Sequence, residues 1–163
     1  MNLSKIFFGV ILTLFTISSV SAADFVLKVA HNGPEQHPFQ NGAVRFKQVM
    51  EEQTNGNVEV QIFPSEQLGS EEETSQMIKQ GTIACAVESA GGGLAPFVPS
   101  ADLLNLPFLF RDLPHFYRVV DGPIGEQIGR NVEDKLDSVF LGWWFSGIRN
   151  EWNGKRPVRT PDD

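Results

Sequence analysis

The order of strand and helix patterns between residues 25 and 87 limits the folds open to this chain more than any other feature. Residues 25–30 and 58–63 have the patterning of strands, and residues 82–87 form a short, nearly unbroken apolar run. Residues 38–54 and 70–80 have the apolar spacing of helices. A strand, helix, strand, helix, strand order predicts a parallel sheet with right-handed crossovers. The predicted fold class is therefore α/β.

Local signals support the bounds of the two helices. Ser70 and Glu73 have the spacing of a capping box, which starts a helix. Asn55-Gly56 and Gly81 are typical of helix ends. One stripe of the first helix is apolar and is expected to face the sheet; it comprises Phe39, Ala43, Phe46, Val49 and Met50.

The second half of the chain predicts further helices and one more strand. A stretch rich in glycine, proline and apolar residues follows Gly91, and short and longer helices are predicted at 114–120 and 122–136. Residues 138–145 are predicted to form another strand. Residues 23–145 would then make up one α/β lobe, and a further unit would begin within 146–163.

The first 22 residues have the pattern of a secretory signal peptide. Lys5 precedes an apolar run from about residue 6 to 17, and small residues end the segment at Val20-Ser21-Ala22. A membrane anchor is the alternative, but the run is short for crossing a bilayer. Cleavage after Ala22 would leave about 141 residues, the length of one ordinary domain. The expected location is the periplasm.

Charge and cysteine content narrow the classes of partner. The formal net charge of -7 argues against nucleic acids and anionic membranes. The single cysteine, Cys85, cannot form an intramolecular disulfide, and its apolar surroundings favour a packing role over a catalytic thiol. The histidines His31, His37 and His115 show no metal-ligand spacing, so neither a metal nor a cofactor is expected.

Polar residues follow the predicted strands where a ligand of a parallel sheet is expected to bind. Asn32 follows the first strand, Glu88 the third and Arg149 the last, while Glu71 begins the second helix. An arginine can hold a carboxylate through two parallel hydrogen bonds, and the other side chains can bind hydroxyls or an amine. Together these four side chains suit the binding of a small polar organic acid. Possible aromatic walls are Trp143, Trp144 and Trp152.

Each of these residues also has a structural interpretation. Glu71 could only favour the start of its helix, Glu88 could pair with a surface lysine, and Arg149 could form a surface ion pair. Two of the three tryptophans would then serve packing.

An enzymatic alternative centres on Ser89. The run Val87-Glu-Ser-Ala-Gly91 resembles the nucleophile elbow of a serine hydrolase but lacks its first glycine. The glycine-rich residues after it are expected to prevent an immediate helix, and His115 is the single later histidine. Serine hydrolysis is therefore disfavoured, and the chain is expected not to be an enzyme.

Five segments, taken in order, resemble one protein family. They are LKVAHNGPEQHP, GNVEVQIFPSEQLGSEEE, IKQGTIACAVESAG, LNLPFLFRD and GIRNEWNGKRPVRTPDD. Their order and spacing resemble the solute-binding proteins of tripartite ATP-independent periplasmic (TRAP) transporters, which import carboxylate-bearing solutes. The resemblance implies two α/β lobes of the periplasmic-binding-protein type, which close on the ligand. The implied partners are a dicarboxylate or sugar acid and the membrane permease subunits.

The resemblance also assigns site residues. Arg149, in the segment GIR, matches one of two arginines near the ligand carboxylate, and Glu88, in VESA, matches a ligand contact. Glu35 and His37 match a loop that varies with substrate in this family. The expected ligand-binding set is Asn32, Glu35, His37, Glu71, Glu88 and Arg149.

The chain is about half as long as the proteins it resembles. Thr160-Pro-Asp-Asp163 has the pattern of a helix start, and in the family a helix and a strand with the second arginine follow such a segment. We therefore expect the second lobe to be largely missing, the chain to be a fragment, and its own binding to be weak. The alternatives are a shortened protein that works by itself and a periplasmic ligand sensor that signals to a receptor.

Overall fold

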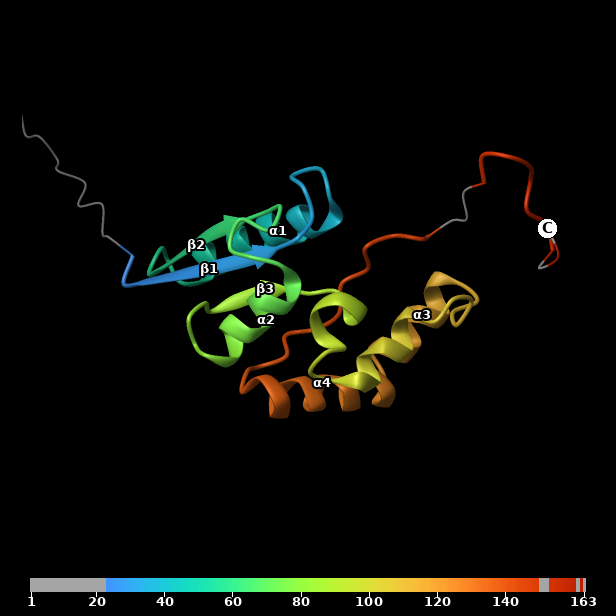
Figure 1. Cartoon of the computed structure of the whole chain (residues 1–163). Coiled ribbons are helices and arrows are strands. Elements are labelled where there is room, and N and C mark those ends of the chain that lie inside the picture. Colours follow the sequence, from blue (N-terminus) through green and yellow to red (C-terminus); the bar gives the residue numbers. More distant parts are fainter. Residues whose placement is uncertain (1–22, 150–152, 161, 163) are drawn as a thin grey trace, which may run out of the picture.

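A parallel three-stranded sheet forms the N-terminal half of the structure, a computed structural model that describes residues 23–149, 153–160 and 162 (Figure 1). The strands are β1 (Phe25–His31), β2 (Val58–Phe63) and β3 (Cys85–Val87), in the order β2-β1-β3. Phe25 pairs with Val58, and Val29 pairs with Cys85. The predicted parallel α/β arrangement is confirmed.

Helices α1 (Pro38–Gln53) and α2 (Glu71–Lys79) are the two connections of this sheet. Ala43 of α1 packs with Val29 and Val60 in one buried cluster, so α1 covers the face of the sheet that bears these valines. The capping box is present at the start of α2, where the Ser70 backbone N–H donates to the Glu73 carboxylate over 2.8 Å.

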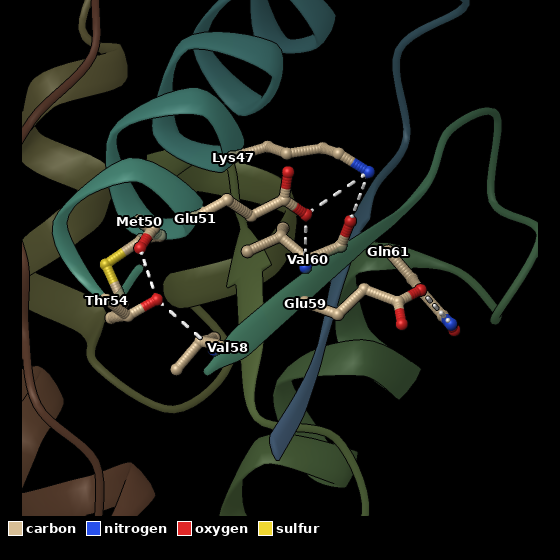
Figure 2. Close-up of polar contacts among 8 residues, drawn as sticks. All are labelled: Lys47, Met50, Glu51, Thr54, Val58, Glu59, Val60 and Gln61. Carbon is tan, nitrogen blue, oxygen red and sulfur yellow. Dashed lines mark hydrogen bonds and ion pairs between the residues drawn. The ribbon is translucent and has the colours of Figure 1, made fainter. Parts of the chain in front are cut away.

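Side chains of α1 also bind the backbone of β2 (Figure 2). Lys47 Nζ donates to the carbonyl oxygen of Val60 over 2.8 Å, and Glu51 Oε1 accepts from the Val60 N–H at 3.0 Å. Lys47 Nζ also lies 3.5 Å from Glu51 Oε1, and the two residues form an ion pair across one turn of the helix. Thr54 accepts from the Val58 N–H, which joins the helix end to the strand start. These contacts fix how α1 leads into β2.

The C-terminal half is helical and has a core of its own. It comprises the π-helical turn η1 (Ala90–Leu94), the 3-10 helix η2 (Pro99–Asn105), α3 (Leu113–Val120) and α4 (Pro123–Leu136). The predicted helices at 114–120 and 122–136 are confirmed to within one residue. The buried residues of this core are Leu94, Val98, Ala101, Ile128, Val132 and Leu136.

The predicted strand at 138–145 is wrong. These residues have no regular secondary structure and no ladder partner among the described residues, and Figure 1 shows the segment leaving α4 and crossing back toward the sheet. Its aromatic side chains hold it instead. A Cβ added at Gly129 of α4 would come within 2.7 Å of the Phe140 ring, and one added at Gly42 of α1 would come within 2.5 Å of the Trp144 ring. A nearly continuous run of apolar and aromatic residues favoured a strand, but a strand also requires a hydrogen-bonding neighbour.

Two further expectations need correction. The third strand begins at Cys85 and not at Thr82, because residues 82–84 form bends before the ladder with β1. A helical turn does follow Ser89 directly, since Ser89 Oγ accepts from the Gly92 N–H and caps η1. The predicted signal peptide at 1–22 and Trp152 lie outside the described residues, as do Pro161 and Asp163 of the predicted helix start. Within the described part of the chain, no helix has the length and apolar character needed to cross a membrane.

Candidate functional site

The carboxyl ends of β1 and β3 bring two of the predicted site residues to one edge of the sheet. His31 and Val87 are register partners at the ends of these strands, and Asn32 and Glu88 are the residues that follow them. The site residue expected at the start of α2, Glu71, is bonded to the segment after β3. Asn32, Glu71 and Glu88 are all partly exposed. The structure thus places Asn32, Glu71 and Glu88 near the carboxyl ends of these strands, and a ligand role for them stays a prediction.

Glu71 binds the residue after Glu88 through both of its carboxylate oxygens. Oε1 accepts from the Ser89 backbone N–H at 2.9 Å, and Oε2 accepts from the Ser89 hydroxyl at 2.6 Å. An added Cβ on Gly92 would lie 2.3 Å from Glu71 Oε2, so a larger residue there would displace this carboxylate. The sequence offered stabilisation of the helix start as the structural alternative for Glu71. The structure adds a second structural role, because Glu71 also holds Ser89.

Glu88 is partly buried beside α2. Its Oε1 is 2.6 Å from Thr74 Oγ1, while its Oε2 is buried and has no hydrogen-bond partner among the described residues. Burial raises the pKa of Glu88 to about 8; the Thr74 hydrogen bond opposes this rise and the Glu71 charge adds to it. Among the described residues, no lysine or arginine forms an ion pair with Glu88. The structure therefore does not show the surface ion pair with a lysine that was the alternative interpretation of Glu88.

The loop after β1 is held by histidines and not by its acidic residue. His31 is buried, and its Nε2 is 2.9 Å from Gln40 Oε1 of α1. His37 caps α1, since its Nδ1 accepts from the Phe39 N–H at 3.2 Å. Glu35 is exposed. A ligand role for Glu35 and His37 stays a prediction, although His37 has a capping role in the structure.

Arg149 is exposed and lies in the irregular segment that follows α4. No hydrogen bond or ion pair among the described residues joins it to the acidic cluster at the sheet edge. Trp143 packs against Phe140 with ring centroids 4.8 Å apart, which fits a packing role. Trp144 is 42% exposed and covers Gly42 of α1.

Among the described residues, no three histidine, cysteine, aspartate or glutamate side chains gather as a metal-binding group would. Cys85 packs on the sheet core, and burial raises the pKa of its thiol.

Sequence reasoning missed the residues that hold the two acidic side chains in place. Thr74 was not singled out, and Ser89 was considered only as a nucleophile. A signal was available, because residues 71, 74 and 75 have the i, i+3, i+4 spacing of one helix face. Polar residues on the inward face of a helix indicate that another segment supplies their partners.

Comparisons of the sequence and of the fold with known proteins point to the same family. Residues 29–163 match the family described as bacterial extracellular solute-binding protein, family 7. The 2,3-diketo-L-gulonate-binding periplasmic protein YiaO of Escherichia coli is 30% identical over 152 residues, which are 93% of this chain and 45% of YiaO.

Two solved structures are similar in fold and sequence. A TRAP periplasmic solute-binding protein from Sulfurospirillum deleyianum with bound succinate is 36% identical with a TM-score of 0.65, over 69% of this chain and 36% of that one. One from Roseobacter denitrificans with bound L-galactonate is 31% identical with a TM-score of 0.65, over 71% and 38%. The chain thus spans less than half the length of these relatives. It belongs to family 7 of the bacterial extracellular solute-binding proteins, and its described lobe is an N-terminal portion of their fold.

Proposed function

We propose that the protein is the periplasmic solute-binding component of a TRAP-type transporter, which captures a small organic acid and delivers it to membrane permease subunits. The family match over residues 29–163 carries this proposal. Relatives in this family bind succinate, L-galactonate and 2,3-diketo-L-gulonate, all of which carry a carboxylate. The ligand and the membrane partner are proposed for the whole protein, because this chain covers under half the length of these relatives.

In this proposal the arginine and the polar edge of the sheet have separate tasks. Arg149 grips the ligand carboxylate, together with groups of a second lobe, through paired N–H···O bonds. Asn32, Glu71 and Glu88 bind the rest of the acid, with Glu35 and His37 in the loop that adapts to the substrate. Closure of two lobes would bury the ion pair and strengthen it, and the ligand would favour the closed state through its extra contacts there.

The protein is proposed to bind its ligand without changing it. Ser89 Oγ bonds to Glu71 and to the Gly92 N–H, and no histidine is among its partners in the described residues. A Ser–His pair of a hydrolase would need one there. A sensor role is the second alternative, and genes for transporter membrane subunits beside this one would favour transport over it.

Export through residues 1–22 completes the proposal. Periplasmic location follows if this segment is cleaved after Ala22. Mass spectrometry of the protein recovered from the periplasm should give a mature N-terminus at Ala23. An uncleaved N-terminus in the cytoplasmic fraction would contradict it.

Binding tests the proposal directly. The protein, with any coding sequence that continues beyond codon 163, is titrated by calorimetry with succinate, L-galactonate and 2,3-diketo-L-gulonate. At least one acid should bind, and Arg149→Ala should weaken it by about 10-fold or more, which is about 1.4 kcal/mol or more.

Arg45→Ala is the matched control, since Arg45 is an exposed arginine of α1. It should leave the affinity unchanged. Unaltered affinity in Arg149→Ala would refute the arginine grip, and no binding by any acid of the panel would refute the ligand class.

A further inference from the structure

Three side chains on one face of α2 bind the segment after β3, and we call this set of contacts the α2 latch. Glu71 accepts from the Ser89 N–H and hydroxyl, as described above. Thr74 Oγ1 lies 2.6 Å from Glu88 Oε1, and the buried Ser75 hydroxyl donates to the Gly93 carbonyl oxygen over 3.0 Å. The latch holds the entry of η1 against the start of α2, at the edge of the sheet.

The middle of the α2 latch has too few hydrogen-bond donors to satisfy an ionised Glu88. Thr74 has one hydroxyl hydrogen but three oxygen neighbours, since Oγ1 is also 2.9 Å from the Ser70 carbonyl oxygen and 3.1 Å from that of Glu71. A carboxylate accepts only and has about four lone-pair positions to satisfy. With Glu88 ionised, one shared hydrogen would serve Oε1, and Oε2 would be a buried charge without a donor.

A proton on Glu88 resolves this shortage. The carboxyl O–H then donates to Thr74 Oγ1, and 2.6 Å is an ordinary distance for such a bond. The Thr74 hydroxyl is free to donate to the Ser70 carbonyl oxygen, as threonines in helices commonly do. Oε2 becomes a neutral carbonyl oxygen, whose burial costs much less than that of a charge.

The groups around Glu88 do not favour its charge. Glu71 on α2 is acidic, and Cys85 on β3 is the titratable group of the strand that leads to Glu88. His31 on β1 pairs in register with Val87; its Nε2 is 2.9 Å from Gln40 Oε1, and its Nδ1 is buried without a hydrogen-bond partner among the described residues. The π-helical turn η1 has the sequence AGGGL and carries no titratable side chain. The pKa of Glu88, raised to about 8, agrees with this arrangement.

We propose that Glu88 is held as a neutral carboxylic acid that donates to Thr74, and that the α2 latch closes fully only while this proton is bound. The observations that carry the proposal are the short contact, the single Thr74 hydrogen and the buried oxygen without a donor. The proposal concerns the edge itself and holds whether or not that edge binds an organic acid.

Proton binding by folded Glu88 makes stability depend on pH in a defined direction. The ordinary pKa of 4.5 applies to the unfolded chain, and the folded value is about 8. Between these values the folded chain retains a proton that the unfolded chain has released. The free energy of unfolding therefore falls as the pH rises from 4.5 to 8, and this contribution is constant above 8.

Thermal unfolding of the full chain between pH 5 and pH 9 tests the proposal. Glu88→Gln keeps a neutral N–H donor at this position, so its Tm should decline less than that of the wild type from pH 5 to 8, by about 5 °C or more. Glu72→Gln is the control, because Glu72 is an exposed glutamate in the first turn of α2, the helix that carries Thr74. Its Tm should follow the wild type, and parallel curves for all three proteins would overturn the proposal.

Infrared spectroscopy of the wild type gives a measurement that needs no variant. A protonated carboxyl has a C=O stretch separate from that of carboxylates. At pH 7 the folded chain should show this band, and the band should disappear with a midpoint near pH 8. Absence of the band at pH 7 would overturn the proposal, even if Glu88→Gln failed to fold.

Discussion

The two helices that border the sheet are tied to their following segments in chemically different ways. Glu51 of α1 accepts from the Val60 N–H at 3.0 Å, and Glu71 of α2 accepts from the Ser89 N–H at 2.9 Å. Glu51 has a cationic neighbour, Lys47, and their side chains are 33% and 40% exposed. Glu71 has a hydroxyl partner instead, and the buried carboxyl oxygen of Glu88 lies in the same latch.

The difference teaches how surroundings decide what a carboxyl contributes. At the α1–β2 junction, water and a lysine stabilise the charge, so the contact should respond to salt and little to packing. In the α2 latch, hydroxyls, backbone groups and glycines surround the acids closely. That contact should respond to added volume, to loss of a donor and to pH.

Added volume in the latch should have the largest effect. A Cβ on Gly93 would lie 2.5 Å from Glu88 Oε2 and 2.7 Å from its Cβ, so Gly93→Ala should lower the free energy of unfolding by ~1–3 kcal/mol. Urea denaturation measures this loss. Gly154→Ala is the control, because an added Cβ there meets nothing within 4 Å. Equal stability of the two variants would show that the latch is not tightly packed.

Loss of the serine donor should have the next largest effect. Ser89→Ala removes the hydroxyl between Glu71 and the Gly92 N–H and should cost ~1–2 kcal/mol of unfolding free energy, measured by urea denaturation. Ser89→Thr retains a hydroxyl and should recover most of this loss. Ser146→Ala, at an exposed serine, should change stability by less than about 0.5 kcal/mol. A similarly small change in Ser89→Ala would argue against a structural role for Ser89.

Removal of the lysine at the α1–β2 junction should have the smallest effect. Lys47→Met should cost about 1 kcal/mol or less, because the ion pair with Glu51 is partly exposed. The cost should shrink when unfolding is measured in high salt, whereas that of Ser89→Ala should not. Arg45→Met, at another cation of α1, controls for the change in net charge. A cost for Lys47→Met that is large and independent of salt would remove the contrast between the two junctions.

Much of this lobe was predictable because the relevant signals are local. Strand β2 and the helices lie within one or two residues of the predicted bounds, since alternation, a capping box and helix-ending glycines act over a few residues. The strand predicted at 138–145 was wrong for the opposite reason. Its residues are apolar and aromatic, as in many strands, but pairing depends on a partner strand elsewhere in space.

The candidate site also has features that local signals predicted and features that they did not. That Asn32, Glu71 and Glu88 would lie at one edge followed from the parallel order of the strands. Their chemical states did not follow, because the sequence gives no measure of which partners surround a side chain. Glu88 was expected to be a charged residue, and its burial beside Glu71 and Thr74 became visible only when α2 was placed against the segment after β3.

The amino-acid sequence thus determined the order of strands and helices in the three-stranded sheet unit, the class of fold and the family, because each depends on residue types at fixed spacings along the chain. The tertiary structure alone decided which acids are tied to a lysine, which to hydroxyls, and which side chains replace a missing strand ladder. Those outcomes depend on distances of 2.5–4 Å between residues far apart in sequence, such as Ser75 and Gly93. Only packing brings such atoms together.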